Sequence, residues 1–222
     1  MKRKNKKEEV TNLAKVEKYI DYNKKLEADD KTFEKLMFIY STAIKELQTK
    51  IEIMKDEFKI FYNYDLIDHI NTRIKTPESI KKKMQKRNLE LNYKEMIENI
   101  NDIAGVRIIC PLKKDIFSIR NLIEKLPEIN VITEKDYVTH PKESGYSSYH
   151  IIVEVPVTLS QNIVYVKVEI QIRTIAMDFW ASLEHKMKYK PEEKIDKKSS
   201  KEWISCAKAI QKLDNKMMLL NS

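Results

Sequence analysis

The segment Val-Tyr-Val-Lys-Val-Glu-Ile-Gln-Ile-Arg, residues 164–173, alternates apolar and polar side chains without a break. In a β-strand successive side chains point to opposite faces, so Val164 and every second residue after it form one apolar face. The other face carries Tyr165, Lys167, Glu169, Gln171 and Arg173. Charged groups in mid-sheet are costly unless they line a wet cleft. We therefore predict a central strand between the core and a cleft, with a plainly exposed sheet face as the alternative.

Only two glycines occur in the 222 residues, against roughly fifteen at the usual frequency of about 7%. Gly105 stands in Asn-Asp-Ile-Ala-Gly-Val-Arg (101–107), and Gly145 stands in Lys-Glu-Ser-Gly-Tyr (142–146). Each lies where a loop meets an apolar, β-branched run. A glycine retained there indicates a backbone angle or a close approach that a side chain would not allow.

The remaining periodicities predict an α/β (α+β) fold, with a mixed, roughly five-stranded sheet flanked by helices. Strands and helices alternate, and some strands are joined too closely for crossover connections, which favours a mixed sheet over a uniform βαβ array. The predicted strands are 106–110, 130–133, 147–155 and 163–172, and the predicted helices after residue 100 are 114–126, 174–189 and 200–220.

A long helix over 31–62 is indicated by apolar residues at alternating steps of four and three. The residues of this seam are Phe33, Met37, Tyr40, Ile44, Leu47, Ile51, Met54 and Phe58. The seam packs on its own domain in the simplest interpretation. Its length also leads us to expect that a subunit interface shares part of it.

The totals restrict the class of protein. A net charge of +8 and a pI of about 9.2 favour anionic partners such as nucleotides, RNA or a membrane surface. No apolar run approaches the ~20 residues of a membrane span, and the basic amino terminus is not followed by the apolar core of a secretory signal. We therefore expect a cytoplasmic protein, in which Cys110 and Cys206 are buried, reduced thiols.

A second basic feature surrounds a predicted helix start at Thr76, where threonine caps the helix and Pro77 occupies its first turn. With two glycines the chain has no phosphate-binding loop, so side-chain cations must hold the phosphates of any nucleotide. The cations around this start are Arg73, Lys75, Lys81, Lys82, Lys83, Lys86 and Arg87. A solvated charged face is the alternative.

Two acids, Asp102 and Glu169, could share Mg²⁺ with a polyphosphate, because Mg²⁺ prefers a few carboxylates plus phosphate oxygens. Taken alone, Asp102 could equally cap a turn. Tyr146 could stack on a base or simply pack. The four histidines show no zinc spacing, so Mg²⁺, or Mn²⁺ in its place, is the expected metal.

Four ordered motifs resemble the RelA/SpoT-type synthetase domain, specifically the single-domain small alarmone synthetases. They are Asp-Ile-Ala-Gly-Val-Arg (102–107), Lys-Glu-Ser-Gly-Tyr-Ser-Ser-Tyr-His (142–150), Val-Glu-Ile-Gln-Ile-Arg-Thr (168–174) and Phe-Trp-Ala-Ser-Leu-Glu-His (179–185). The resemblance implies a nucleotidyltransferase-like fold over roughly 33–220. It also implies transfer of the β,γ-pyrophosphate of ATP to the ribose 3′-hydroxyl of GDP or GTP, which makes the alarmone (p)ppGpp of the bacterial stringent response.

The resemblance also implies roles for single residues. Asp102 and Glu169 would be the catalytic and metal-binding acids, with Glu169 orienting or deprotonating the 3′-hydroxyl. The implied ATP-binding residues are Arg73 and Arg107 on the two sides of the adenine, and Lys75, Ser79, Lys83 and Lys86 at the phosphates. The implied GDP/GTP-binding residues are Tyr146, stacked on guanine, with Lys142, Ser144, His150 and Gln171 around it.

Two departures from the family pattern carry predictions. No His-Asp hydrolase precedes the synthetase motifs, so we predict synthesis without hydrolysis. One subgroup forms tetramers with an allosteric alarmone cleft lined by lysines and polar side chains. The matching positions here are Gln48, Glu52, His69, Asn71 and Asp178. Because cations are lost and acids gained, we predict weak or no activation by pppGpp.

The predicted organisation is a basic, partly mobile extension over 1–30 and a single synthetase domain over 31–222, with 73–189 as its catalytic core. Expected partners are ATP and GDP or GTP, with GMP as a further acceptor, other subunits in a homotetramer or another homo-oligomer, and a single-stranded RNA regulator. DNA and membranes are not expected. The rival functions are a non-catalytic nucleotide or RNA-binding regulator and a template-independent nucleotidyltransferase, which would need paired acids on one strand.

Overall fold

The computed structural model describes residues 20, 24–26, 31–188 and 197–220. Its centre is a five-stranded sheet in the order β1-β2-β5-β4-β3. The strands are β1 (His69–Ile74), β2 (Ala104–Cys110), β3 (Asn130–Asp136), β4 (Tyr149–Thr158) and β5 (Ile163–Thr174). Only β2 and β5 pair in parallel, and the other three pairings are antiparallel. The predicted mixed sheet is confirmed.

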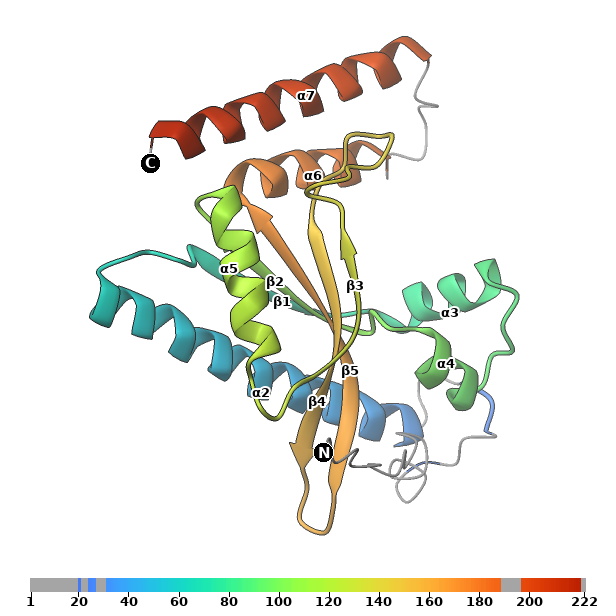
Figure 1. Cartoon of the computed structure of the whole chain (residues 1–222). Helices are drawn as coiled ribbons and strands as arrows, with labels where there is room; N and C mark the ends of the chain where they lie inside the picture. Colours follow the sequence, from blue (N-terminus) through green and yellow to red (C-terminus); the bar gives the residue numbers. More distant parts are fainter. Residues whose placement is uncertain (1–19, 21–23, 27–30, 189–196, 221–222) are drawn as a thin grey trace, which may run out of the picture.

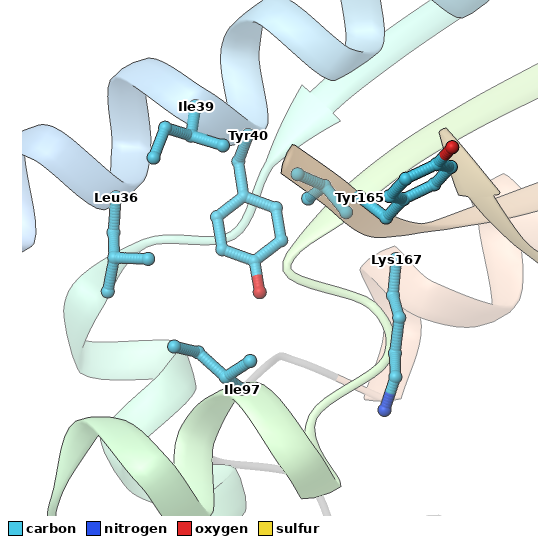
Figure 2. A pocket seen from close by; sticks show the side chains of 7 residues that line it. Leu36, Ile39, Tyr40, Ile97, Tyr165 and Lys167 are labelled. Carbon is cyan, nitrogen blue, oxygen red and sulfur yellow. The ribbon is translucent and has the colours of Figure 1, made fainter. Parts of the chain in front are cut away.

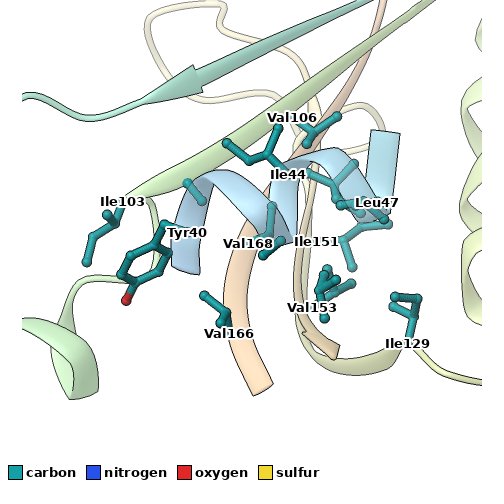
Figure 3. Close-up of a cluster of buried hydrophobic side chains, with 14 of the residues drawn as sticks. Tyr40, Ile44, Leu47, Ile103, Val106, Ile129, Ile151, Val153, Val166 and Val168 are labelled. Atoms are coloured by element: carbon teal, nitrogen blue, oxygen red, sulfur yellow. The ribbon is translucent and has the colours of Figure 1, made fainter. Parts of the chain in front are cut away.

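The apolar face of β5 is the centre of the core, as its alternation predicts. Val164, Val168, Ile170 and Ile172 are fully buried there. Two helices, α2 (Lys31–Tyr62) and α5 (Lys113–Glu124), bury their apolar residues in the same cluster. Figure 3 shows side chains of α2 meeting those of β2, β4 and β5. This packing leaves the opposite, polar face of β5 to a different environment.

The heptad seam of α2 packs within the chain. Six of its eight residues are buried in the core cluster, and Met37 and Phe58 are partly buried against it. The six buried residues of the seam are covered within the chain, and the expectation that a subunit interface shares another part of the seam, at Met37 and Phe58, stays a prediction. The exposed apolar side chains of α2 lie elsewhere, at Phe38, Ile53 and the end of the helix.

Two elements were missed in the sequence. The edge strand β1 (His69–Ile74), whose side chains are mostly exposed, was not among the predicted strands. The short helix α4 (Tyr93–Asn99) begins at Asn92, whose side chain accepts a hydrogen bond from the Glu95 N–H. The helix start at Thr76 is confirmed, since its side chain caps α3 (Pro77–Lys86).

The last two helices, α6 (Ile175–Lys188) and α7 (Lys197–Leu220), lie together at one end of the sheet (Figure 1). The inner side of α7 carries buried Ala207 and Asp214, whereas Leu213 and Met217 are exposed. Asp214 accepts a hydrogen bond from the Thr174 hydroxyl at 2.8 Å, so a buried polar contact ties α7 to the end of β5. Cys110 is buried as predicted, but Cys206 on α7 is exposed.

Part of the amino-terminal extension is integral to the domain. Ile20 and Leu26 are only 4% and 3% exposed, and Lys25 forms an isolated β-bridge with Asn92. These residues of the extension therefore pack on the domain; residues 1–19, 21–23 and 27–30 lie outside the described residues, and a partly mobile extension stays a prediction. Among the helices of the described part, none is long and apolar enough to cross a membrane.

Candidate nucleotide-binding and catalytic site

A cavity of about 170 Å³ opens on the polar side of the sheet, where β1, β2 and β5 run side by side. It is lined by Asn71, Thr72, Arg73, Gly105, Val106, Arg107, Glu169 and Gln171. The strand register places Gly105 between Arg73 on β1 and Glu169 on β5. Four of the predicted site residues therefore meet in one cavity.

Gly105 gives the Arg73 side chain its place over the sheet. A Cβ at this position would lie 3.2 Å from Nε and 3.3 Å from Cγ of Arg73. The Arg73 side chain is 50% exposed, and its guanidinium lies 3.9 Å from the Glu169 carboxylate. The close approach inferred from this glycine is thus confirmed, and the group that approaches is a flexible cation.

Asp102 precedes β2 and holds two lysines. Its carboxylate lies 3.0 Å from Lys75 Nζ and 2.7 Å from Lys83 Nζ. A hydrogen bond from the Lys75 N–H to the Ile103 carbonyl fixes the β1 end beside this turn. Burial would raise the pKa of Asp102, but the hydrogen bonds and charges of Lys83 and Lys75 outweigh burial and lower it. Asp102 is therefore ionised at neutral pH.

The other predicted phosphate ligands lie along α3. Ser79 is in its first turn, where its N–H and hydroxyl both contact the Thr76 hydroxyl. Lys86 lies exposed in the last turn, at the opposite end of the helix from Ser79. The structure thus gathers Lys75, Lys83 and Asp102 at one point and leaves Lys86 farther along the helix.

Glu169 lies at the centre of the polar face. Its carboxylate is 3.1 Å from His150 Nδ1 and accepts a hydrogen bond from the Gln171 amide at 2.9 Å. Burial would raise the pKa of Glu169, but the hydrogen bond and charge of His150 and the hydrogen bond of Gln171 lower it. The negative charge of Asp102 opposes this shift, so the two carboxylates are near enough to interact. Glu169 is an ionised acceptor with room on its cavity side.

These two acids are a suitable donor set for Mg²⁺. The described residues contain no group of three or more His, Cys, Asp or Glu that could hold a metal by themselves. Mg²⁺ commonly takes one or two carboxylates and completes its shell with phosphate oxygens and water. Two ionised carboxylates beside a phosphate-binding cluster of lysines fit that pattern.

The second predicted cluster surrounds Tyr146. Its hydroxyl lies 2.8 Å from His150 Nε2, and its ring meets those of Tyr137 and His150 edge to face. Lys142 lies over the Tyr137 and Tyr146 rings at 4.6 and 5.0 Å. With a neutral ring, His150 Nδ1–H donates to Glu169 and Nε2 accepts from the Tyr146 hydroxyl; with a protonated ring, both nitrogens donate. Lys142, Tyr146, His150 and Gln171 are thus brought together as predicted.

The loop that carries Tyr146 depends on Gly145. This glycine has a φ of 86°, and a Cβ on it would come within 2.3 Å of the Ala207 Cβ on α7. Hydrogen bonds between Lys142 and both Gly145 and Tyr146 close the turn, in which Ser144 lies half-buried. Both reasons offered for retaining a glycine, the backbone angle and the close approach, apply here.

Two residues of the site were not recognised in the sequence. Arg173 is 4% exposed and donates hydrogen bonds to Ser148, Gln171, Tyr146 and Asp178. Asp178, on α6, also pairs with Arg107 at 3.2 Å. The available signal was a cation on the cleft face of β5 followed, five residues later, by an acid on the next helix.

The polar face of β5 does not form one continuous cleft. Tyr165 and Lys167 lie beyond the site, next to α4, where the Lys167 ammonium donates to the Glu98 carbonyl at 2.9 Å. Figure 2 shows them beside a small apolar pocket with Leu36, Ile39 and Tyr40 of α2 and Ile97 of α4. Only Glu169, Gln171 and Arg173 face the nucleotide site.

The five positions matched to an allosteric cleft have separate surroundings. Gln48 donates to Glu52 along α2 at 2.7 Å, and His69 contacts Asp68. Asn71 lines the cavity, and Asp178 holds the two arginines. Weak activation by pppGpp stays a prediction.

Comparison with known proteins accounts for this arrangement. The family model described as the region found in RelA / SpoT proteins matches residues 72–194. The GTP pyrophosphokinase YwaC of Bacillus subtilis (strain 168) is 42% identical over 182 residues, covering 82% of this chain and 87% of that protein. The GTP pyrophosphokinase YjbM of the same organism is 33% identical over 189 residues, covering 85% and 88%.

Solved structures agree with these relatives. Small alarmone synthetase 1 of Bacillus subtilis bound to its product pppGpp has a TM-score of 0.80 at 32% identity, covering 86% of this chain and 97% of that chain. Small alarmone synthetase 2 of the same organism has a TM-score of 0.77 at 39% identity, covering 85% and 97%. The family model spans more than half of this chain, and the chain therefore belongs to the RelA/SpoT family.

Proposed function

We propose that this protein is a GTP pyrophosphokinase that transfers the β,γ-pyrophosphate of ATP to the ribose 3′-hydroxyl of GDP or GTP. The observation that carries the proposal is Glu169, a carboxylate held ionised between a cation-lined cavity and an aromatic cluster. The relatives are named for this activity, and one related structure contains pppGpp.

The cavity side takes ATP in this proposal. Arg73 and Arg107 flank Gly105, where an adenine ring would lie between two guanidinium planes. Lys75, Lys83 and Ser79 hold the phosphates, and Lys86, in the last turn of α3, is a further phosphate-binding residue. A related small alarmone synthetase 1 structure is bound to AMPCPP, which supports an adenine nucleotide here. Asp102 and Glu169 would hold Mg²⁺, which neutralises phosphate charge as it shifts toward the leaving oxygen.

The aromatic side takes the guanosine nucleotide. The Tyr146 ring is the stacking surface for guanine, and Lys142 and Ser144 lie on the same loop, where they can reach its phosphates. His150 and Gln171 hold the Glu169 carboxylate in place from this side. The acceptor ribose then lies next to Glu169.

The chemistry needs positioning and charge neutralisation more than covalent participation of the protein. Glu169 accepts the proton of the 3′-hydroxyl while the oxygen of that hydroxyl bonds to the β-phosphorus of ATP. The bond from that phosphorus to the α-phosphate oxygen breaks, and AMP leaves with the electron pair. An ionised carboxylate is the form that this step requires, and its low pKa supplies it at neutral pH.

Labelled pyrophosphate transfer tests the proposal. The protein is incubated with γ-labelled ATP, Mg²⁺ and, separately, GMP, GDP or GTP, and the products are resolved by chromatography. Label should move to a guanosine nucleotide, and Glu169→Gln should reduce the rate by about 10²–10⁴-fold. If no label moves while both nucleotides bind, the protein is a nucleotide-binding regulator on the same fold.

Assembly into a homotetramer or another homo-oligomer, and regulation by single-stranded RNA, are further proposals. Exposed Ile60, Phe61 and Tyr62 at the end of α2 support the first, because large apolar side chains gathered at one place favour a contact. Light scattering gives the mass in solution, and a monomer mass would contradict the first proposal. The mass and the rate of label transfer are then measured with a single-stranded RNA oligomer, and no change in either would contradict the second.

A further inference from the structure

Asp178 stands between the two halves of the site. It lies in the first turn of α6, and its Oδ1 atom is 3.2 Å from Arg107 Nη1 and 2.8 Å from Arg173 Nη1. Arg107 comes from β2 and Arg173 from β5, two neighbouring parallel strands. One carboxylate oxygen therefore joins side chains from three elements.

On one side of this carboxylate, Arg107 belongs to the ATP cavity. It lines the cavity opposite Arg73, and its position there depends on where its guanidinium is held. Burial and the charges of Arg173 and Arg73 lower the pKa of Arg107, whereas Asp178 opposes them. Three guanidinium groups in so small a volume need anions among them: Glu169 lies 3.9 Å from Arg73, and Asp178 is the anion that pairs with both Arg107 and Arg173.

On the other side, Arg173 belongs to the guanosine side. Its Nη2 donates to the Tyr146 hydroxyl at 2.7 Å and to the Gln171 amide oxygen at 2.9 Å, and its guanidinium carbon lies 5.3 Å from the Tyr146 ring centre. Moving Arg173 would therefore move the Tyr146 ring and loosen Gln171, which donates a hydrogen bond to Glu169.

We infer that Asp178 is a positioning residue that couples the two nucleotide sites, so that ATP bound against Arg107 favours the bound position of Tyr146. The inference rests on the proposed function. A nucleotide that fixes Arg107 also fixes Asp178, and through it Arg173 and Tyr146. The coupling must be reciprocal, because binding free energies around a closed cycle are equal by either route.

Calorimetric titration measures this coupling without turnover. The Kd of AMPCPP, an ATP analogue, is determined with and without saturating GDP, and the Kd of GDP with and without saturating AMPCPP. We expect each ligand to tighten the other about fivefold or more in the native protein. Asp178→Asn should bring this ratio close to one, and Asp178→Glu, which keeps the charge, should restore part of it.

A matched control is Asp65→Asn, which removes an exposed carboxylate paired only with Lys59 and should leave the ratio unchanged. A second measurement does not depend on any variant: AMPCPP alone should slow amide hydrogen exchange of residues 142–146 in the native protein. An unchanged ratio in Asp178→Asn, or loop exchange unaffected by AMPCPP, would overturn the inference.

These experiments distinguish a failure of the coupling inference from a failure of the proposed function. If both nucleotides bind with a coupling that Asp178→Asn removes but label is not transferred, the inference stands and the pyrophosphokinase proposal fails. If label is transferred and Asp178→Asn keeps the native coupling, the proposal stands and the inference fails.

Discussion

The two glycines mark two halves of the site that are built in different ways. Around Gly105 the ATP side consists of long, partly exposed cations, each paired with a carboxylate: Lys75 and Lys83 with Asp102, Arg73 with Glu169, and Arg107 with Asp178. Around Gly145 the guanosine side consists of the rings of Tyr146 and His150, joined to buried Arg173 by hydrogen bonds, on a loop that packs on α7. A flexible side chain meets the first glycine, and a neighbouring helix meets the second.

This difference indicates how each half tolerates change. Flexible cations can shift by a few tenths of an ångström at little cost, whereas a packed helix cannot move without disturbing its own contacts. We therefore expect the ATP side to respond mainly to loss of charge and the guanosine side to respond mainly to changes of shape.

The largest expected effect is a loss of charge on the ATP side. Asp102→Asn keeps the size of the side chain but releases Lys75 and Lys83 and removes a metal-binding oxygen. We expect kcat to fall by about 10²–10³-fold in the labelled transfer assay. Asp65→Asn is the matched control, with native activity expected. A fall of less than tenfold would mean that Asp102 is only a turn residue.

The second-largest expected effect is a change of shape on the guanosine side. Gly145→Ala puts a Cβ at a positive φ and against Ala207, which should cost about 2–4 kcal/mol and lower Tm by roughly 4–16 °C. The KM for GDP should rise while that for ATP holds. Adding Ala207→Gly should restore part of the loss, and failure to do so would contradict the contact with α7.

The same substitution on the ATP side should do much less. Gly105→Ala meets the side chain of Arg73, which is exposed enough to move aside. We expect a change in stability below about 1 kcal/mol and a rise of less than tenfold in the KM for ATP. A Tm drop equal to that of Gly145→Ala would remove the distinction between the two halves.

The smallest expected effect is a pH dependence shared by both halves through Glu169. Its folded pKa lies below the unfolded value of 4.5. The ionised side chain therefore adds stability that is fully present above pH 4.5 and is lost as pH falls through the folded pKa. Denaturant titrations between pH 7 and pH 3 give the unfolding free energies of the native protein and of Glu169→Gln. The difference between these two free energies should become smaller only below pH 4.5. Narrowing above pH 5 would contradict the lowered pKa.

Much of the fold could be predicted because its core strands have a strict period of two. The apolar alternation of β5 specifies both its core face and its cleft face, and β2 and β4 follow the same rule. β1 escaped prediction because its apolar face is short: only Ile70 and Ile74 pack against the core, and the other side chains of His69–Ile74 are polar. The start of α4 did carry a signal, Asn92 followed three residues later by Glu95.

The site could be predicted where its residues lie next to each other along or across the strands. The alternation of β5 predicts Glu169 and Gln171 on the cleft face, whereas the roles of Arg73 and Arg107 are implied by the resemblance to the family. The pairing of Arg173 with Asp178 depends on how α6 turns away from the end of β5, which no period in the sequence encodes. The packing of the amino-terminal segment likewise depends on residues far along the chain, because Leu26 donates to the Leu91 carbonyl and Lys25 bridges to Asn92.

Because Gly145 contacts Ala207, the region that matches the family model is shorter than the unit that folds together. The family region ends at residue 194, whereas the loop that carries Tyr146 rests on residue 207. Exchanging 72–194 between relatives would transplant a loop shaped for one helix onto the surface of another. Functional chimaeras within this family should therefore be those that take α7 together with the loop it supports.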